Sequence, residues 1–232
     1  MGYFRAGFDV VGIDTMAQKN YPFEFYQADA MTYPLEGFDV IHASPPCQAY
    51  TAALNTAPER RQNHPDLVAA ARDYLDQSGC LYVIENVVGA PLRNFFMLCG
   101  TMFGLQTPCG AELRRHRLFE VNWTHPLTSE CSHYSPRTLA VIGGTAPAGQ
   151  RGRTITVTGS VAQMNVERNV KRETFSANYA RIAMGIDWMN RDELSQAIPP
   201  AYTEFIGKQL LRQIEGARNG SDGPGATLER RD

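Results

Sequence analysis

Short apolar runs recur along the first half of the chain, and each is closed by a polar or acidic residue. Strands of a parallel sheet are buried on both faces, so they read as continuous apolar stretches of this length rather than as alternating patterns. The runs therefore predict strands over Val10–Ile13, Glu24–Ala28, Phe38–Ala43 and Leu81–Ile84.

A helix is predicted between the last two runs. Apolar residues recur at helical spacing in Pro65–Gln77, and Pro65 followed by Asp66 is typical of a helix start. Strand, helix and strand in succession predict a βαβ unit and an α/β sheet, whose ligands bind at the carboxyl ends of the strands. Four side chains that can carry chemistry fall at these ends: Asp14, Asp29, Cys47 and Glu85.

The second half of the chain returns to longer periodic segments. We expect helices over Arg93–Phe103, Glu173–Met184 and Pro200–Ile214, and a strand over Arg115–Val121.

A stretch of different character interrupts them. Residues 124–163 are rich in Thr, Ser, Gly and Pro and contain short β-type runs, Leu139–Ile142 and Thr154–Val157, so we expect a small β-rich insertion. Residues 215–232 are too polar to bury a core and predict a disordered tail.

Composition changes this picture little. The 232 residues are 43% hydrophobic and 20% charged, which is ordinary for a globular protein. No apolar stretch approaches the roughly 20 residues that span a bilayer, and no basic-then-apolar leader is visible, so we expect an intracellular protein. Five cysteines without paired spacing favour reduced thiols over a disulfide framework.

Charge is distributed unevenly. Residues 111–185 carry 10 Lys and Arg against 5 Asp and Glu, whereas residues 1–110 carry 6 against 11. The basic middle segment is a candidate surface for nucleic-acid phosphates, although a solvated basic face gives the same pattern.

A thiol and a carboxyl group at strand ends suit attack on a ring that must also be protonated. A thiolate that adds to C6 of cytosine makes C5 nucleophilic, and an acid at N3 and a cation near O2 ease the addition. Cys47 fits the nucleophile and Glu85 the acid, while alternation along a strand would point Arg115 and Arg117 to one face. Each also fits a plainer role, as a packed thiol, an ion-paired or helix-capping carboxylate, or a basic strand.

Three short motifs carry a resemblance to a known family. Pro45-Pro46-Cys47-Gln48 matches the catalytic loop of the DNA (cytosine-5) methyltransferases, and Glu85-Asn86-Val87 matches their motif that grips the target cytosine. Residues 113–117 resemble their Gln-x-Arg-x-Arg motif, with Leu113 in place of Gln. The chain is similar to the small bacterial or phage members, with the motifs in family order over most of residues 2–212.

The resemblance implies a fold and a cofactor. The fold would be Rossmann-like, a mostly parallel sheet with flanking helices and a small β-rich target-recognition insertion. S-adenosyl-L-methionine would be held near Asp14, Asp29, Pro46 and Gln196, although Gln196 stands where the family usually has Asn. The implied catalytic residues are Cys47, Glu85, Arg115 and Arg117.

The implied partner is double-stranded DNA, from which the target base must be flipped. Its contacts would come from Gln48, Asn86, Arg137, Arg151 and Arg153. The protein would be a cytoplasmic monomer in a bacterial or phage-infected cell, with DNA methylation and restriction–modification as its setting. Some family members act on tRNA, so an RNA substrate is the less favoured alternative.

The resemblance also implies domain boundaries. Residues 1–119 would form the catalytic core, residues 120–170 the target-recognition region and residues 171–214 the closing helices, followed by the tail at 215–232.

The motifs depart from the family at the beginning of the chain. Met1 stands just after the position of the glycine loop that holds the cofactor, so the first strand of the core would be missing. Three explanations stay open: an upstream start, a strand supplied by another chain, or an inactive relative that still binds DNA.

One further pattern concerns metal. Cys131-Ser132-His133 could begin a zinc site with Cys109 or His125. Because the chain has no second Cys-x-x-Cys pair, we expect no metal.

Overall fold

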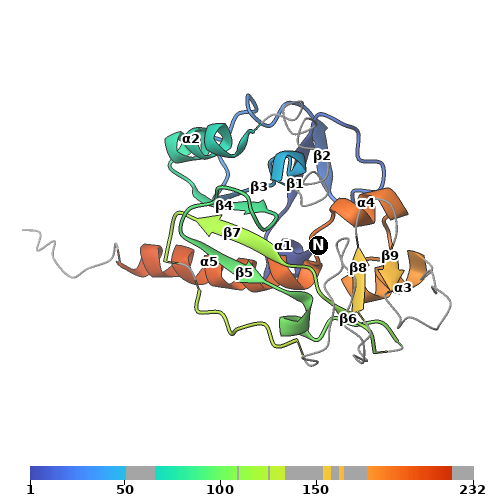
Figure 1. The fold of residues 1–232 in the computed structure, drawn as a ribbon. Helices are drawn as coiled ribbons and strands as arrows, with labels where there is room; N and C mark the ends of the chain where they lie inside the picture. Colours follow the sequence, from blue (N-terminus) through green and yellow to red (C-terminus); the bar gives the residue numbers. More distant parts are fainter. Residues whose placement is uncertain are drawn as a thin grey trace, which may run out of the picture.

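A mixed four-stranded sheet forms the centre of the protein (Figure 1). The computed structural model describes residues 1–50, 66–108, 110–124, 126–133, 154–157, 162–164 and 177–220. The strand order of the central sheet is β3 (Val40–Ala43), β4 (Leu81–Asn86), β7 (Arg117–Val121) and β5 (Phe95–Leu98).

The strands of this sheet run in both directions. β3 and β4 are parallel, and the connection between them contains helix α2 (Val68–Ser78). β7 runs antiparallel to both β4 and β5. The carboxyl ends of β3 and β4 therefore meet at one edge of the sheet, because Ala43 lies opposite Ile84.

Helices cover both faces of the sheet, which is what strands of this apolar character require (Figure 1). Side chains at alternate positions point to opposite faces. Helix α5 (Pro200–Gly220) packs Tyr202, Ile206 and Leu210 on the face formed by Val83 and Phe119. On the other face, α2 packs on Tyr82, Ile84 and Leu118.

A second, two-stranded sheet precedes the central one in the chain. β1 (Val11–Asp14) pairs in parallel with β2 (Glu24–Gln27). The short helix α1 (Gly2–Ala6) lies against α5, where Gly207 leaves room for Ala6 and Tyr3.

A third group lies at one end of the molecule (Figure 1). β6 (Glu112–Leu113), β8 (Thr154–Val157) and β9 (Ala162–Met164) form a three-stranded sheet. Helices α3 (Ala177–Met184) and α4 (Arg191–Gln196) share a core with Leu113. β8 confirms the β-type run predicted at the same residues, and Leu139–Ile142 lies outside the described part.

Several predicted elements need correction. Residues predicted as the helix Arg93–Phe103 instead form β5 and a 3-10 turn, η4 (Gly100–Phe103), because the apolar run at 95–98 pairs with β7. The predicted boundary after residue 119 falls inside β7. Helix α5 continues past Ile214 to Gly220, so the predicted disordered tail begins as helix.

The predicted strands of the first half and the helix between the last two are confirmed, with small shifts at their ends. The α/β class is confirmed as well. Within the described residues, no helix is both long and apolar enough to cross a bilayer.

Candidate active site

The loop that follows β3 presents Cys47. Ser44, Pro46 and Gln48 of this loop are exposed, and Cys47 is half-buried. The loop ends in a 3-10 turn, η1 (Gln48–Tyr50), in which the Tyr50 N–H donates to the Cys47 carbonyl at 3.0 Å. Two prolines stiffen the backbone before the thiol, because proline fixes φ and offers no N–H.

Asn86 ties this loop to the end of β4. Its side chain is buried, and its Nδ2 donates to the Pro45 carbonyl at 3.0 Å. Its Oδ1 accepts from the Val87 N–H at 2.9 Å. The Asn86 amide thus positions the backbone just before Cys47. The sequence did not indicate this role, because Asn86 was predicted to contact DNA.

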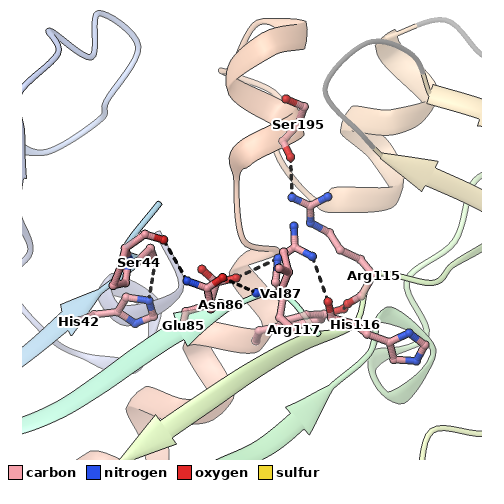
Figure 2. A network of polar contacts seen from close by, with 11 residues as sticks. His42, Ser44, Glu85, Asn86, Val87, Arg115, His116, Arg117 and Ser195 are labelled. Atoms are coloured by element: carbon pink, nitrogen blue, oxygen red, sulfur yellow. Dashed lines mark hydrogen bonds and ion pairs between the residues drawn. The ribbon is translucent and has the colours of Figure 1, made fainter. Parts of the chain in front are cut away.

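Glu85 lies inside β4 rather than just after it, and it is only 8% exposed. It faces the same side of the sheet as Val83, opposite Phe119 on β7. Arg117 lies two residues before Phe119 on the same face, and its Nε is 2.8 Å from Glu85 Oε1. This diagonal cross-strand ion pair is visible in Figure 2.

Burial governs the acidity of Glu85. It raises the pKa of the carboxyl group, while Arg117, a hydrogen bond from Ser44 and the charge of Arg115 act in the opposite direction. Because the net shift is upward, this carboxyl group holds a proton more readily than an exposed glutamate does.

Ser44 itself lies within hydrogen-bonding distance of a half-buried histidine. Its hydroxyl lies 3.3 Å from Nε2 of His42 (Figure 2). The other ring nitrogen of His42, Nδ1, lies 2.6 Å from the Tyr3 hydroxyl. Burial lowers the pKa of His42 to about 4, so the imidazole is neutral at physiological pH. Sequence reasoning missed both His42 and Ser44, although both belong to the run that leads into the Pro-Pro-Cys loop.

Arg115 anchors the site to the closing helices. It is buried, and its Nη2 donates to the carbonyl of Ser195 on α4 at 2.6 Å (Figure 2). The Tyr202 hydroxyl donates to the Arg115 carbonyl at 2.6 Å. Burial and the neighbouring Arg117 lower the pKa of Arg115, whereas Glu85 and Cys47 act to raise it. Arg115 is therefore electrostatically coupled to the other three predicted catalytic residues.

The predicted cofactor residues form a less connected set. Asp14 ends β1, and Asp29 follows the adjacent parallel strand β2, so two carboxylates share one sheet edge. The Asp14 carboxylate accepts from the Met16 N–H at 2.8 Å and Gln18 Nε2 at 3.2 Å. Asp29 is exposed and accepts from the Met31 N–H at 2.9 Å.

No hydrogen bond or ion pair within residues 1–50 joins Asp14 or Asp29 to the Cys47 loop. Pro46 is exposed on that loop, and Gln196 is exposed at the end of α4, one residue after Ser195. Of the predicted DNA contacts, Gln48 is exposed beside Cys47. The remaining arginines, Arg137, Arg151 and Arg153, lie outside the described residues.

A second group of reactive side chains includes the histidine of the arginine motif. Cys99, His116, Cys131 and His133 place their ligand atoms within 4.8 Å of one another. Burial opposes ionisation of Cys99, but hydrogen bonds from His116, Thr101 and His133 outweigh it and lower the pKa of the thiol to about 6. Cys131 and His133 were named from the sequence, and the structure places Cys99 and His116 beside them; Cys109 and His125, the other residues considered, lie outside the described residues.

Comparison with known proteins adds no relative: the sequence matches no family model and no curated protein. The geometry of the site therefore carries the functional argument.

Proposed function

We propose that the protein is a DNA (cytosine-5-)-methyltransferase that transfers a methyl group from S-adenosyl-L-methionine to C5 of cytosine in duplex DNA. The observation that carries this proposal is the buried Glu85, paired with Arg117 at 2.8 Å and joined through Ser44 to the loop that presents Cys47. Such a set combines a nucleophile, an acid and a cation within one local network.

The chemistry divides among these residues. The Cys47 thiolate adds to C6 of a flipped cytosine, and the Glu85 carboxyl group, whose pKa burial raises, donates its proton to N3. Arg117 and Arg115 stabilise the negative charge that develops on the ring and its O2. The electron pair at C5 would then take the methyl group, and the sulfonium of the donor would leave as the neutral thioether. A base removes the C5 proton, the thiolate leaves from C6, and the N3 proton returns to Glu85.

The residues at the edge of the two-stranded sheet fit the cofactor. Carboxylates at the ends of neighbouring parallel strands can accept hydrogen bonds from ribose hydroxyls and from an adenine amino group. Asp14 and Asp29 would hold these groups, and the bound cofactor would supply an electrophilic methyl group. The oriented carboxylate of Asp14, fixed by the Met16 N–H, supports this assignment.

The direct test is transfer of labelled methyl from S-adenosyl-L-methionine to duplex DNA. We expect incorporation by the chain and none by Cys47→Ala. The matched control is Cys80→Ala, because Cys80 immediately precedes β4, at the opposite end from Glu85, and should leave transfer unchanged.

Two outcomes contradict the proposal. Transfer that survives Cys47→Ala excludes the thiol adduct. Duplex binding without any transfer by the wild-type chain favours the alternative, an inactive DNA-binding relative. Matched DNA and RNA hairpins in the same assay distinguish the preferred polymer, and we expect DNA.

A further inference from the structure

The four side chains of the Cys/His group come from three separate segments of the chain. Cys99 follows β5, His116 precedes β7, and Cys131 and His133 lie in the segment after β7. His133 Nε2 lies 3.4 Å from Cys99 Sγ, and His116 Nε2 lies 3.4 Å from Cys131 Sγ. The two imidazole rings have centroids 5.1 Å apart.

The two sulfur–nitrogen separations match the edges of a coordination tetrahedron. With zinc–sulfur bonds of about 2.3 Å and zinc–nitrogen bonds of about 2.0–2.1 Å, tetrahedral geometry places sulfur and nitrogen ligands about 3.5 Å apart. Both measured sulfur–nitrogen distances are 3.4 Å. Two thiols and two imidazoles are also the ligand set that zinc most often takes in structural sites.

A hydrogen-bond donor lies beside the Cys99 sulfur. Cys99 is the N-cap residue of η4, and its carbonyl accepts from the Met102 N–H at 3.0 Å. The Thr101 hydroxyl donates to Cys99 Sγ at 3.3 Å. Hydrogen bonds of this kind hold a metal-bound sulfur in place and neutralise part of its charge. Since Cys99 is fully buried, a thiolate there also needs a nearby positive charge.

We propose that Cys99, His116, Cys131 and His133 bind one structural zinc ion. Four protein ligands close the coordination sphere, which is typical of structural rather than catalytic zinc. Binding releases the thiol protons and joins residues 131–133, in the segment after β7, to the end of β5 and the beginning of β7.

The position of the site gives it a further consequence. His116 lies between Arg115 and Arg117, and its carbonyl accepts from Arg117 Nη1 at 3.0 Å (Figure 2). A metal that fixes the His116 ring also fixes the backbone from which both arginines extend. The site therefore positions the arginine motif, and its existence does not depend on the proposed methyl transfer.

The first experiment measures metal content. The full chain, purified without added metal, is expected to contain about one zinc per molecule by elemental mass spectrometry. Cys131→Ser should lose most of it, because three ligands remain. The matched control, Cys80→Ser, removes a half-buried thiol outside the cluster and should keep the zinc.

A second measurement uses only the wild-type chain, so it does not depend on folding of a variant. Co²⁺ added to the chelator-treated protein should saturate at one equivalent and give the intense visible and thiolate charge-transfer bands of a tetrahedral sulfur-ligated ion. Zinc should displace it. A chain that neither contains zinc nor gives these bands overturns the proposal, as does a Cys99–Cys131 disulfide found by intact mass under non-reducing conditions.

Discussion

At the scale of single residues, one buried carboxyl group sets the properties of the candidate site. Glu85 is buried in the central sheet beside the Cys47 loop, where Arg117, Ser44 and the charge of Arg115 offset part of the loss of hydration. A carboxyl group in such a place is expensive to ionise, and general acids need that tendency to work near neutral pH.

The raised pKa of Glu85 gives methyl transfer a pH dependence. Only the protonated carboxyl group can donate to N3, so we expect the rate to fall as pH rises through the folded-state pKa. Glu85→Gln should lower the rate by about 10²–10⁴-fold and remove this decline. Initial rates across a pH series measure both effects.

Glu36→Gln provides the control, because Glu36 is exposed in a loop and should leave the profile unchanged. A Glu85→Gln enzyme with the wild-type rate and profile would show that another group protonates the base.

At the scale of elements, the sequence pattern predicted those strands whose form follows from neighbouring residues in the chain. The strands at 11–14, 24–27, 40–43 and 81–86 follow from apolar runs bounded by turn residues. Phe95–Leu98 was taken for helix because a short apolar run has no distinctive period, and its strand form depends on pairing with β7, about twenty residues later. Cys131 and His133 were named from the sequence, but Cys99 and His116 were not connected with them, since these residues meet only after β5 and β7 pair.

The short helix α4 depends on its N-cap. Asn190 accepts from the N–H groups of Asp192 and Glu193 at 2.9 and 3.1 Å, and Glu193 Oε2 accepts from the Asn190 N–H at 2.8 Å. Asn190→Ala should lower the free energy of unfolding by about 1 kcal/mol. Because the Ser195 carbonyl on α4 accepts from Arg115, the rate of methyl transfer should also fall. Urea unfolding measures the stability change.

Asn190→Ser is the matched variant, because serine caps a helix about as well as asparagine. It should keep both stability and transfer. Equal losses in the two variants would mean that the side chain acts through something other than the cap.

At the scale of the whole molecule, the site rests on a sheet held between helices on both faces (Figure 1). A buried ion pair connects these layers: Arg72 on α2 donates from Nη2 to Glu120 Oε2 on β7 at 2.7 Å, and both side chains are only 4% exposed. The same Oε2 accepts from the Arg93 N–H at 2.6 Å. The sequence does not reveal this pair, because its partners are 48 residues apart.

Removing one partner of that pair should be costly. Glu120→Gln leaves the Arg72 charge buried and uncompensated, so we expect a loss of about 3–5 kcal/mol in the free energy of unfolding. Chemical denaturation followed by circular dichroism measures it. Glu204→Gln, which breaks only the exposed pair with Lys208 on α5, should cost less than about 0.5 kcal/mol. A similar small effect at Glu120 would contradict the importance of the buried pair.

The most direct test of the central claim is covalent capture of the Cys47 adduct. In duplex DNA that carries 5-fluorocytosine, the C5 fluorine cannot leave as a proton does, so the thiol remains bonded to C6 after methyl transfer. With S-adenosyl-L-methionine present, we expect a denaturation-resistant protein–DNA complex from the wild-type chain, attached at Cys47 by peptide mass spectrometry, and none from Cys47→Ala. Capture through another residue, or methyl transfer to ordinary DNA without any capture, would contradict the mechanism.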